Sequence, residues 1–520
     1  MRRLGLAMKR AGVLRGVMTG ALLLGALLVV GARPAPKRTN PLETALKTHV
    51  ETLASDDFGG REPGTEGETK TLRYLARQWF DIGLEAGTNI PGSGWFAPVE
   101  LVAREPVLSR ATFMRGKKRV VLPADSVFVV TSGLRSLVQD APLVFVGHAT
   151  GSMLGRAELA GRVAVMLDSL PQGSTGDVAG DRAGRLLDAG ALAVVTVLDD
   201  ERGLEDVIAR RRRAGYAVAG ERLGSEIEAF LSPATAGLLL AGGHHSTLER
   251  LRSDAKSATF KPYVLGLSGT FEATSGETRI NTHNLIGRIA GRNPAAGAVL
   301  VMAHWDHFGE CAAPPAEDLI CNGAIDNASG LAVITEAARV LAKGKPMDRD
   351  VYFVATTGEE LGLLGAVAFA ENPPIPLDRF VAAFNVDSTG LVPAGGPIGV
   401  VGKGQTRLDP LIADVVRRMK RKVAPGDGAN AYIMRQDSWV LIQHDVPMVM
   451  VSNSYGNMER IERFMEDTYH RPSDEAGATI DYGGMADDVN LQVELVRAFA
   501  DAKRFPSKAS PADQKRGQTP

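Results

Sequence analysis

The sequence predicts an α/β protein in which helices cover both faces of a mostly parallel, mixed sheet and a smaller α/β module is inserted in the chain. Two observations lead to this fold class. From residue 282 onward, apolar strand-like runs alternate with helical segments, as in consecutive βαβ units. The run 297–303 is continuously apolar, which suits a strand buried on both faces. A three-layer α/β/α arrangement follows, because a parallel sheet needs helices on each face.

Length and composition narrow the classes of function. With 520 residues the chain is long enough for two or three domains. Its composition is that of an ordinary globular protein, with 44% hydrophobic and 23% charged residues. The net charge of −1 supplies no field that would attract nucleic acid or an anionic membrane surface. We therefore expect no nucleic-acid partner.

The N-terminal segment 1–32 has the features of an export signal. Basic residues precede the apolar stretch 17–30, and small residues suited to cleavage follow it. The stretch is short for a membrane-spanning helix, so an uncleaved anchor that ties the protein to a membrane is the alternative. Export predicts a periplasmic or secreted protein, and a bacterial cell envelope fits better than a eukaryotic secretory route. The only two cysteines, Cys311 and Cys321, suit one disulfide in such a compartment.

The first half of the chain has a helical N-terminal segment followed by strand-rich segments. Residues 41–83 predict two helical segments, interrupted by the glycine-rich loop 55–65 with its three acids and one arginine. Residues 95–130 alternate apolar and polar side chains, as antiparallel strands do. Residues 131–277 read as a self-contained α/β module without a cluster of metal-ligating or nucleophilic residues. Its expected elements are a strand at 141–147, a turn and strand over 159–167, a helix at 181–187 that continues into the apolar run 190–197, and a helix at 233–240.

The second half follows the βαβ pattern steadily. Gly344 and Pro346 end one of its helices. The expected strands are 284–289, 297–303, 351–356, 380–386 and 446–451, and the expected helices are 331–341, 361–369, 410–420 and 485–499.

Polar residues stand where these strands or the short loops after them end. Parallel strands meet at one edge of the sheet, which is where open α/β sheets bind ligands. Each polar residue has an ordinary structural role available, such as a helix N-cap for Asp326 or a turn former for Asp387. The residues are His304, Asp306, Asp326, Glu359, Glu360, Asp387 and His470.

Taken together, these residues predict a metal site. A cluster of uncompensated carboxylates would cost several kcal/mol, roughly, in folding free energy, and divalent cations remove that cost. Imidazole and carboxylate ligands together favour Zn²⁺. Alternation along the strand places His304 and Asp306 on the same side. One of these two residues can therefore ligate metal while the other fixes its orientation.

The order of these motifs resembles peptidase family M28, whose members are co-catalytic zinc peptidases. The segment 53–65 resembles the N-terminal signature of that family, and the inserted module resembles a protease-associated (PA) domain. The resemblance covers nearly the whole chain after residue 32 and implies the three-layer zinc-peptidase fold. It divides the chain into a signal peptide (1–32), a linker (33–44), the N-terminal part of the peptidase domain (45–130), a PA insertion (131–277), the catalytic domain (278–505) and a disordered tail (506–520).

The resemblance also implies a role for each site residue. Two zinc ions would hold a bridging hydroxide, with Asp326 as the shared ligand. His304 and Asp387 would complete one site, and Glu360 and His470 the other. Glu359 would be the general base, and Asp306 would orient His304. The family further implies a cis peptide bond between Asp326 and Asn327.

The function expected from this resemblance is that of an exported metallo-exopeptidase, an aminopeptidase that removes N-terminal residues from peptides. A carboxypeptidase or dipeptidase on the same scaffold is the alternative. An inactive receptor-like binding protein is disfavoured because every ligand and the base are present. One departure concerns the substrate pocket. The family often has Ser-Asp-His where this chain has Gln436-Asp437-Ser438, which alters the pocket wall.

Overall fold

The computed structural model describes residues 40–150, 155–170, 181–200, 202–213, 215–220, 223–243, 247–257, 259–312, 314–477 and 479–507. The predicted signal segment 1–32, the linker up to residue 39 and the tail from residue 508 lie outside the described residues. Within the described part, none of the helices combines the length and apolar character needed to cross a membrane.

Helix α2 (Pro41–Leu53) begins where the helical pattern of the sequence begins, inside the predicted linker. The side chain of Asn40 caps the helix by accepting a hydrogen bond from the amide of Leu42, and Pro41 occupies the first turn. Residues 41–44, which were assigned to the linker, are therefore helical. After η1 (Asp56–Arg61), helix α3 (Glu66–Ile82) ends at Gly83 in the left-handed conformation, as its sequence position suggests.

Fifteen strands within the described residues form one continuous sheet. Strands β11, β14, β15 and β17 pair in parallel, whereas β10 and β16 join them antiparallel, so the predicted mixed, mostly parallel sheet is confirmed for this half. The strands are β1 (Glu85–Ala86), β2 (Phe96–Arg115), β3 (Lys118–Val120), β4 (Val127–Thr131), β5 (Arg135–Phe145), β6 (Val163–Leu167), β7 (Ala193–Val197), β8 (Tyr216–Val218), β9 (Ile227–Leu231), β10 (Tyr263–Ile289), β11 (Ala298–His304), β14 (Asp350–Thr356), β15 (Phe380–Asn385), β16 (Gly399–Val401) and β17 (Met448–Ser452).

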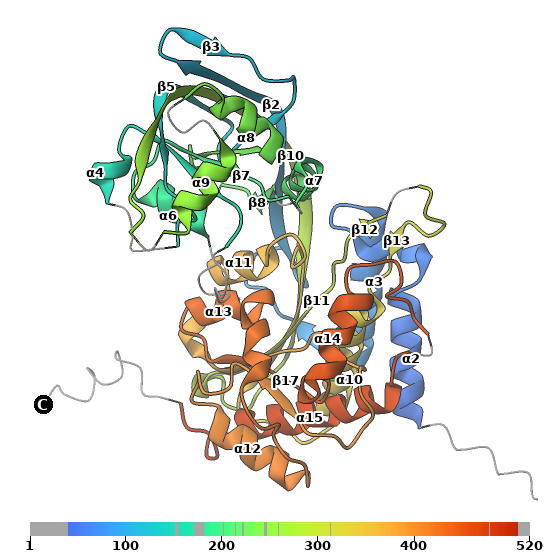
Figure 1. Ribbon diagram of the computed structural model, residues 1–520. Helices are drawn as coiled ribbons and strands as arrows, with labels where there is room; N and C mark the ends of the chain where they lie inside the picture. Colours follow the sequence, from blue (N-terminus) through green and yellow to red (C-terminus); the bar gives the residue numbers. More distant parts are fainter. Residues whose placement is uncertain are drawn as a thin grey trace, which may run out of the picture.

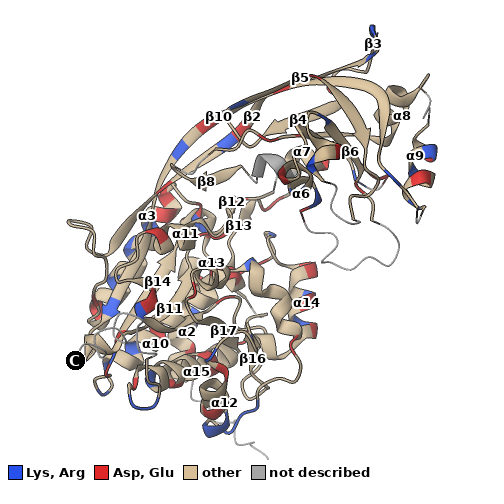
Figure 2. Ribbon diagram, turned by 90° about the vertical axis from the view of Figure 1, so that its left-hand side faces the viewer, with Lys and Arg blue, Asp and Glu red and all other residues tan. Residues whose placement is uncertain are grey.

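The sheet spans two lobes (Figure 1). Strands β2 and β10 run from one lobe into the other as a long curved ribbon (Figure 2). Phe113 on β2 and Val129 on β4 belong to the core of the distal lobe. The predicted module boundary at residue 131 is therefore wrong, and the lobe begins within β2. The alternating sequence could not reveal this boundary, because an unbroken pair of strands crosses it without a loop.

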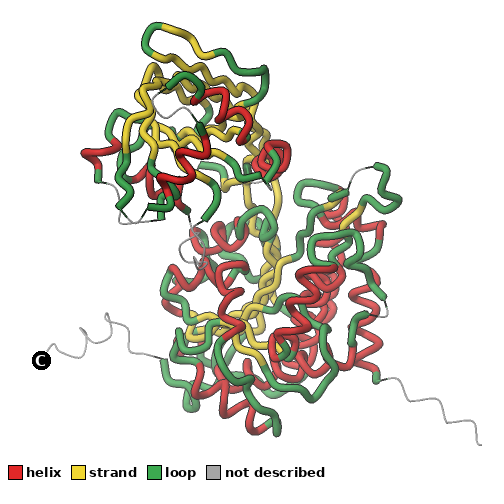
Figure 3. Tube along the Cα trace, in the orientation of Figure 1, coloured by secondary structure: helices red, strands yellow, loops and turns green. Residues whose placement is uncertain are grey.

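The other lobe has three layers, with helices on both sides of the strands (Figure 3). Alternate residues of β11 enter different cores: Val299 and Val301 face α2, α3, α10 and α15, whereas Leu300 and Met302 face α11 and α13. This alternation explains why the strand is apolar throughout. The helices of this lobe not yet located are α10 (Gly330–Ala342), α11 (Leu364–Glu371), α12 (Asp409–Arg418), α13 (Ser438–Gln443), α14 (Met458–Asp467) and α15 (Tyr482–Ala500).

The distal lobe is a smaller α/β unit. Strands β5, β6, β7 and β9 lie parallel in it, and β4 closes the edge antiparallel. Aromatic contacts between Phe113 and Phe271 and between Phe145 and Tyr263 tie its core to β10. Its helices are α4 (Arg156–Leu159), α6 (Arg182–Asp188), α7 (Leu204–Arg213), α8 (Pro233–Leu240) and α9 (Leu248–Ala255).

Candidate metal centre

The carboxyl ends of β11, β14 and β15 lie side by side and position the first site residues. His304 is the last residue of β11 and pairs with Thr356, the last residue of β14. On the other side, β15 ends next to Met302, so Asp387 follows two residues beyond that strand end. All residues of β11 are buried. The edge that the sequence predicts for a ligand site is thus formed by these three strand ends.

Asp326 reaches this edge from the turn before α10. Its peptide bond to Asn327 is cis, which confirms the expectation. Asn327 is fully buried, where its side chain donates to the carbonyl of Val386 and accepts from the amide of Gly330. These bonds fix the start of α10 beneath β15 and hold the carboxylate of Asp326 at the strand ends.

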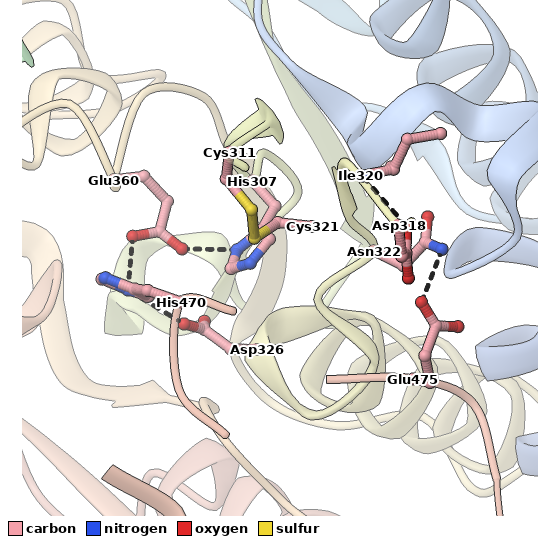
Figure 4. Close-up of a disulfide and its surroundings, with 10 residues drawn as sticks. All are labelled: His307, Cys311, Asp318, Ile320, Cys321, Asn322, Asp326, Glu360, His470 and Glu475. Atoms are coloured by element: carbon pink, nitrogen blue, oxygen red, sulfur yellow. Dashed lines mark hydrogen bonds and ion pairs between the residues drawn. A yellow bond between two sulfur atoms is a disulfide. The ribbon is translucent and has the colours of Figure 1, made fainter. Parts of the chain in front are cut away.

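The two oxygens of the Asp326 carboxylate face different histidines. Oδ1 lies 3.1 Å from Nε2 of His304, and Oδ2 lies 3.3 Å from Nε2 of His470. A second carboxylate accompanies each histidine. Oδ1 of Asp387 lies 3.7 Å from Nε2 of His304, and Oε2 of Glu360 lies 2.9 Å from Nε2 of His470 (Figure 4). The arrangement has two halves joined by Asp326.

Buried polar atoms that face only one another show that these residues fit metal ions. Nε2 of His304, Nε2 of His470 and Oδ2 of Asp326 are buried and, among the described residues, have no hydrogen-bond partner outside the ion pairs of the cluster. Nδ1 of His304 lies 3.1 Å from the backbone carbonyl of Asp306, so it donates there and leaves Nε2 free as a ligand. Imidazole nitrogen and carboxylate oxygen together suit Zn²⁺. The donor set therefore fits two such ions.

The pKa values in the cluster reflect its crowded charges. Burial disfavours the ionised form of Asp326, but His304 and His470 outweigh this and hold its pKa well below the usual range. Burial likewise opposes protonation of His470, yet Asp326 and Glu360 raise its pKa to about 9. The histidines and carboxylates thus stabilise each other's charged forms, a role that divalent cations would share.

Glu359 and Asp306 lie beside the two halves. Burial raises the pKa of Glu359 well above its usual range. The carboxylate of Asp306 accepts from the backbone amides of Glu359 (3.1 Å) and Glu360 (3.3 Å), while it stays 3.8 Å from Nδ1 of His304. The expected contact between Asp306 and the imidazole of His304 is therefore made by the backbone carbonyl of Asp306. Its carboxylate fixes the turn that presents the two glutamates.

Part of the sequence that forms this site matches the model of a known family. Residues 284–495 match the model described as peptidase family M28. This segment is a peptidase domain of family M28. The matched region contains all seven site residues predicted from the sequence.

Curated relatives match this chain over short segments. The alkaline phosphatase isozyme conversion protein of Escherichia coli (strain K12) is 30% identical over 123 residues, which cover 22% of this chain and 35% of that protein. Aminopeptidase YwaD of Bacillus subtilis (strain 168) is 44% identical over 69 residues, which cover 13% of this chain and 15% of that protein. The chain thus spans about a third or less of the length of these relatives.

A solved structure shares the fold on a larger scale. The aminopeptidase from Aneurinibacillus sp. strain AM-1 matches with a TM-score of 0.55 and 18% identity, covering 91% of this chain and 97% of that chain. At this identity the similarity speaks for the fold alone, and it confirms the predicted fold class.

Sequence reasoning missed His307 as a neighbour of the M28 site. Its Nδ1 lies 2.6 Å from Oε1 of Glu360, the carboxylate oxygen turned away from His470 (Figure 4). His307 is buried, and its ring packs close to Gly323, where a Cβ would lie 2.6 Å from the imidazole. Its position three residues after His304 in the sequence suggested that it lies near the site. Alternation along a strand places it on the side opposite His304, however, and so did not predict its contact with Glu360.

The M28 site opens at His470. The side chain of His470 is 32% exposed, whereas that of Glu360 is 2% exposed. Tyr469 stacks on the imidazole at 3.5 Å, and Phe308 meets it edge-on. Nearby, Cys311 and Cys321 form the expected disulfide with Cα atoms 5.7 Å apart, which closes the hairpin of β12 (Gly309–Glu310) and β13 (Ile320–Cys321) (Figure 4).

The departure at Gln436-Asp437-Ser438 lies under the M28 site. Oε1 of Gln436 accepts hydrogen bonds from Asn385 and Ser438, and Asp437 bonds Thr356 at the end of β14. Burial raises the pKa of Asp437 to about 6. These side chains support the strand ends from below the metal ligands.

Proposed function

We propose that this protein is an exported dinuclear zinc aminopeptidase that acts on peptides. The observation that carries the proposal is the Asp326 carboxylate, which offers one oxygen to the half with His304 and the other to the half with His470. A shared carboxylate between two histidine–carboxylate pairs is what a two-metal hydrolytic site requires. The names of the matched relatives, which include aminopeptidases, support the same class.

When bound, the metals would lower the pKa of a water molecule and would polarise the scissile carbonyl as Lewis acids. His304 and Asp387 would hold one ion, Glu360 and His470 the other, and Asp326 both. Because no oxygen of Glu359 is needed as a ligand, its carboxylate can take a proton from the attacking water and deliver it to the leaving amine as the C–N bond breaks. Asp306, bonded to the amide of Glu359, keeps this carboxylate in place.

The location and the distal lobe are parts of the same proposal. The disulfide between Cys311 and Cys321 supports a periplasmic or secreted protein, because such bonds persist outside the reducing cytosol. An uncleaved N-terminal segment would keep the protein at the membrane. The distal lobe, with its parallel strands β5, β6, β7 and β9, would be a PA domain.

A panel of substrates tests the proposal. Aminoacyl-anilides and peptides with a free N-terminus should be cleaved, peptides with a blocked N-terminus should not, and a chelator should stop the reaction until zinc is restored. Cleavage of N-blocked peptides from the C-terminus would instead identify a carboxypeptidase. Failure to bind zinc and to cleave any peptide would refute the enzymatic assignment.

A further inference from the structure

A buried arginine outside the family-matched segment touches the backbone on both sides of the metal centre. Arg61 is 0% exposed and lies at the end of η1, in the glycine-rich loop. Its Nε donates to the carbonyl of Trp305 at 2.9 Å, directly after His304. Its two Nη atoms donate to the carbonyls of Asn322 (2.5 Å) and Gly323 (2.9 Å), just before the turn that carries Asp326.

The loop that holds Arg61 lies so close to the hairpin that Gly60 has no room for a side chain. A Cβ on Gly60 would lie 2.5 Å from the carbonyl oxygen of Cys321 and 2.8 Å from the backbone of Gly309. Gly60 also has a φ of +61°, which side chains with a Cβ rarely adopt. The backbone before Arg61 therefore lies directly on the disulfide-bonded hairpin.

A buried aspartate binds backbone amides of the turn that carries Asp326. Asp474 is 1% exposed, and its two carboxylate oxygens accept from the amides of Ile325 (2.9 Å) and Asp326 (3.0 Å). Its backbone carbonyl accepts from the amide of Ala324 at 3.0 Å. Asp474 lies four positions after His470 in the sequence. It therefore joins the loop that carries His470 to the backbone of Asp326.

Two opposite charges thus bind the polar backbone groups around Asp326. The guanidinium of Arg61 takes carbonyls of residues 322 and 323, and the carboxylate of Asp474 takes amides of residues 325 and 326. Charge-assisted hydrogen bonds are shorter and stronger than neutral ones. Both side chains direct these hydrogen bonds to the backbone around Asp326, so we assign them to that backbone rather than to the set of metal ligands.

We propose that Arg61 and Asp474 are positioning residues that set the carboxylate of Asp326 between two metal ions, so that metal affinity depends on them. This inference rests on the proposed two-metal function. Burial lowers the pKa of Arg61 to about 10, and the carboxylates of Asp326 and Asp474 oppose that shift. Arg61 accordingly stays charged at neutral pH.

The chain offers a matched control at the other end of the same strands. Arg349 is also 0% exposed, and its guanidinium donates to the carbonyls of Ala296 (2.8 Å), Phe499 (2.7 Å) and Phe505 (2.7 Å). It precedes the first residue of β14, at the amino edge of the sheet. Like Arg61, it donates hydrogen bonds to several buried backbone carbonyls, but it does so away from the metal centre.

The experiment compares Arg61→Lys, Asp474→Asn and the control Arg349→Lys in the full-length protein. Metal is removed with a chelator, and zinc is added back to measure stoichiometry by mass spectrometry and dissociation constants by chelator competition. The cobalt-substituted proteins supply a d–d absorption spectrum of the site. Thermal unfolding of each metal-free variant measures stability separately.

Wild type and Arg349→Lys should bind two metals with the same dissociation constants and the same cobalt spectrum, although the control unfolds at a lower temperature. Arg61→Lys and Asp474→Asn should weaken metal binding by about 10–100-fold, as expected for residues that orient ligands, and should alter the cobalt spectrum. Should Arg61→Lys fail to fold, Asp474→Asn decides. Wild-type metal affinity in Asp474→Asn, or an equal loss in Arg349→Lys, overturns the inference. A wild type that binds fewer than two metals refutes the proposed function instead.

Discussion

The two ends of the same buried strands are built in opposite ways. At the amino edge, Arg349 donates from all three guanidinium nitrogens to backbone carbonyls, and Asp350 pairs with Arg288. At the carboxyl edge, Nε2 of His304, Nε2 of His470 and Oδ2 of Asp326 are buried and face only other residues of the cluster. In folded proteins most buried polar groups have a hydrogen-bond partner. The carboxyl edge departs from this rule in the way expected of a site completed by something bound.

The largest effect should come from Glu359→Gln. The amide cannot accept a proton, so kcat should fall by about 10²–10⁴-fold, while both metals remain bound because no ligand is changed. Steady-state kinetics with a metal determination on the same sample measures both quantities. Replacing Asp326 by Ala is the contrasting variant and should lose metal as well as activity. Near-normal turnover in Glu359→Gln would show that another group at this edge is the base.

Removal of metal should lower the stability of the folded protein and should loosen the carboxyl edge most. A ligand at 100 times its dissociation constant stabilises the native state by about 2.7 kcal/mol per site. Chelation should therefore lower the unfolding temperature, and the shift should grow with the zinc concentration used beforehand. Hydrogen exchange should show a larger loss of protection at residues 322–329 than at the start of β14. A uniform loss across both edges would contradict the contrast between them.

Arg349→Met should have the complementary effect at the amino edge. The substitution leaves several buried carbonyls without donors, each worth about 1–3 kcal/mol. The free energy of unfolding by denaturant should fall by a few kcal/mol, roughly, while kcat and KM of the folded enzyme stay unchanged. A change in KM or in metal content would show that the two edges are coupled through the strands.

The sequence predicts the strand ends well because they depend on local patterns. Val299 to Ala303 is apolar because both faces of β11 are buried, and the polar residues that follow stand at its end. The elements β16, α13 and α14 were not predicted, although the ten residues of α14 are enough to show a helical period. Three residues of β16 or six of α13 are too few to show a period.

Contacts between the site and distant backbone could not be predicted. Arg61 meets Gly323 across 262 positions of sequence, and it binds a carbonyl that any residue type would offer. Asp474 likewise binds amides rather than side chains. No residue pattern identifies such partners. The ligands are different, since their residue types and order carry the chemistry that the sequence displays.

The smallest predicted effect concerns a buried acid at the carboxyl edge outside the metal cluster. Asp488 on α15 is 1% exposed and accepts hydrogen bonds from Ser452, the last residue of β17, and from the amide of Asn453. Unlike Asp326, it has protein donors and no facing histidine. Burial nevertheless raises its pKa to about 7. This carboxyl tests whether burial at this edge has a cost where metals do not compensate it.

The sign of the pH dependence follows from that shift. The unfolded chain releases the proton of Asp488 near pH 3.9, roughly, whereas the folded protein retains it to about pH 7. Between these values the native state binds more protons, so this group's contribution to stability is present at low pH and is lost as pH rises. The loss is at most about 1.4 kcal/mol per pH unit. Over about one pH unit above 7 the contribution levels off.

Asp488→Asn should remove this dependence. The free energy of unfolding, measured with denaturant in the presence of chelator from pH 5 to 8, should fall less steeply with pH in the variant than in wild type up to pH 7. The difference should reach about 2 kcal/mol at most. Parallel curves would mean that the donors at the end of β17 keep Asp488 ionised, in which case hydrogen bonds alone compensate a buried carboxylate at this edge.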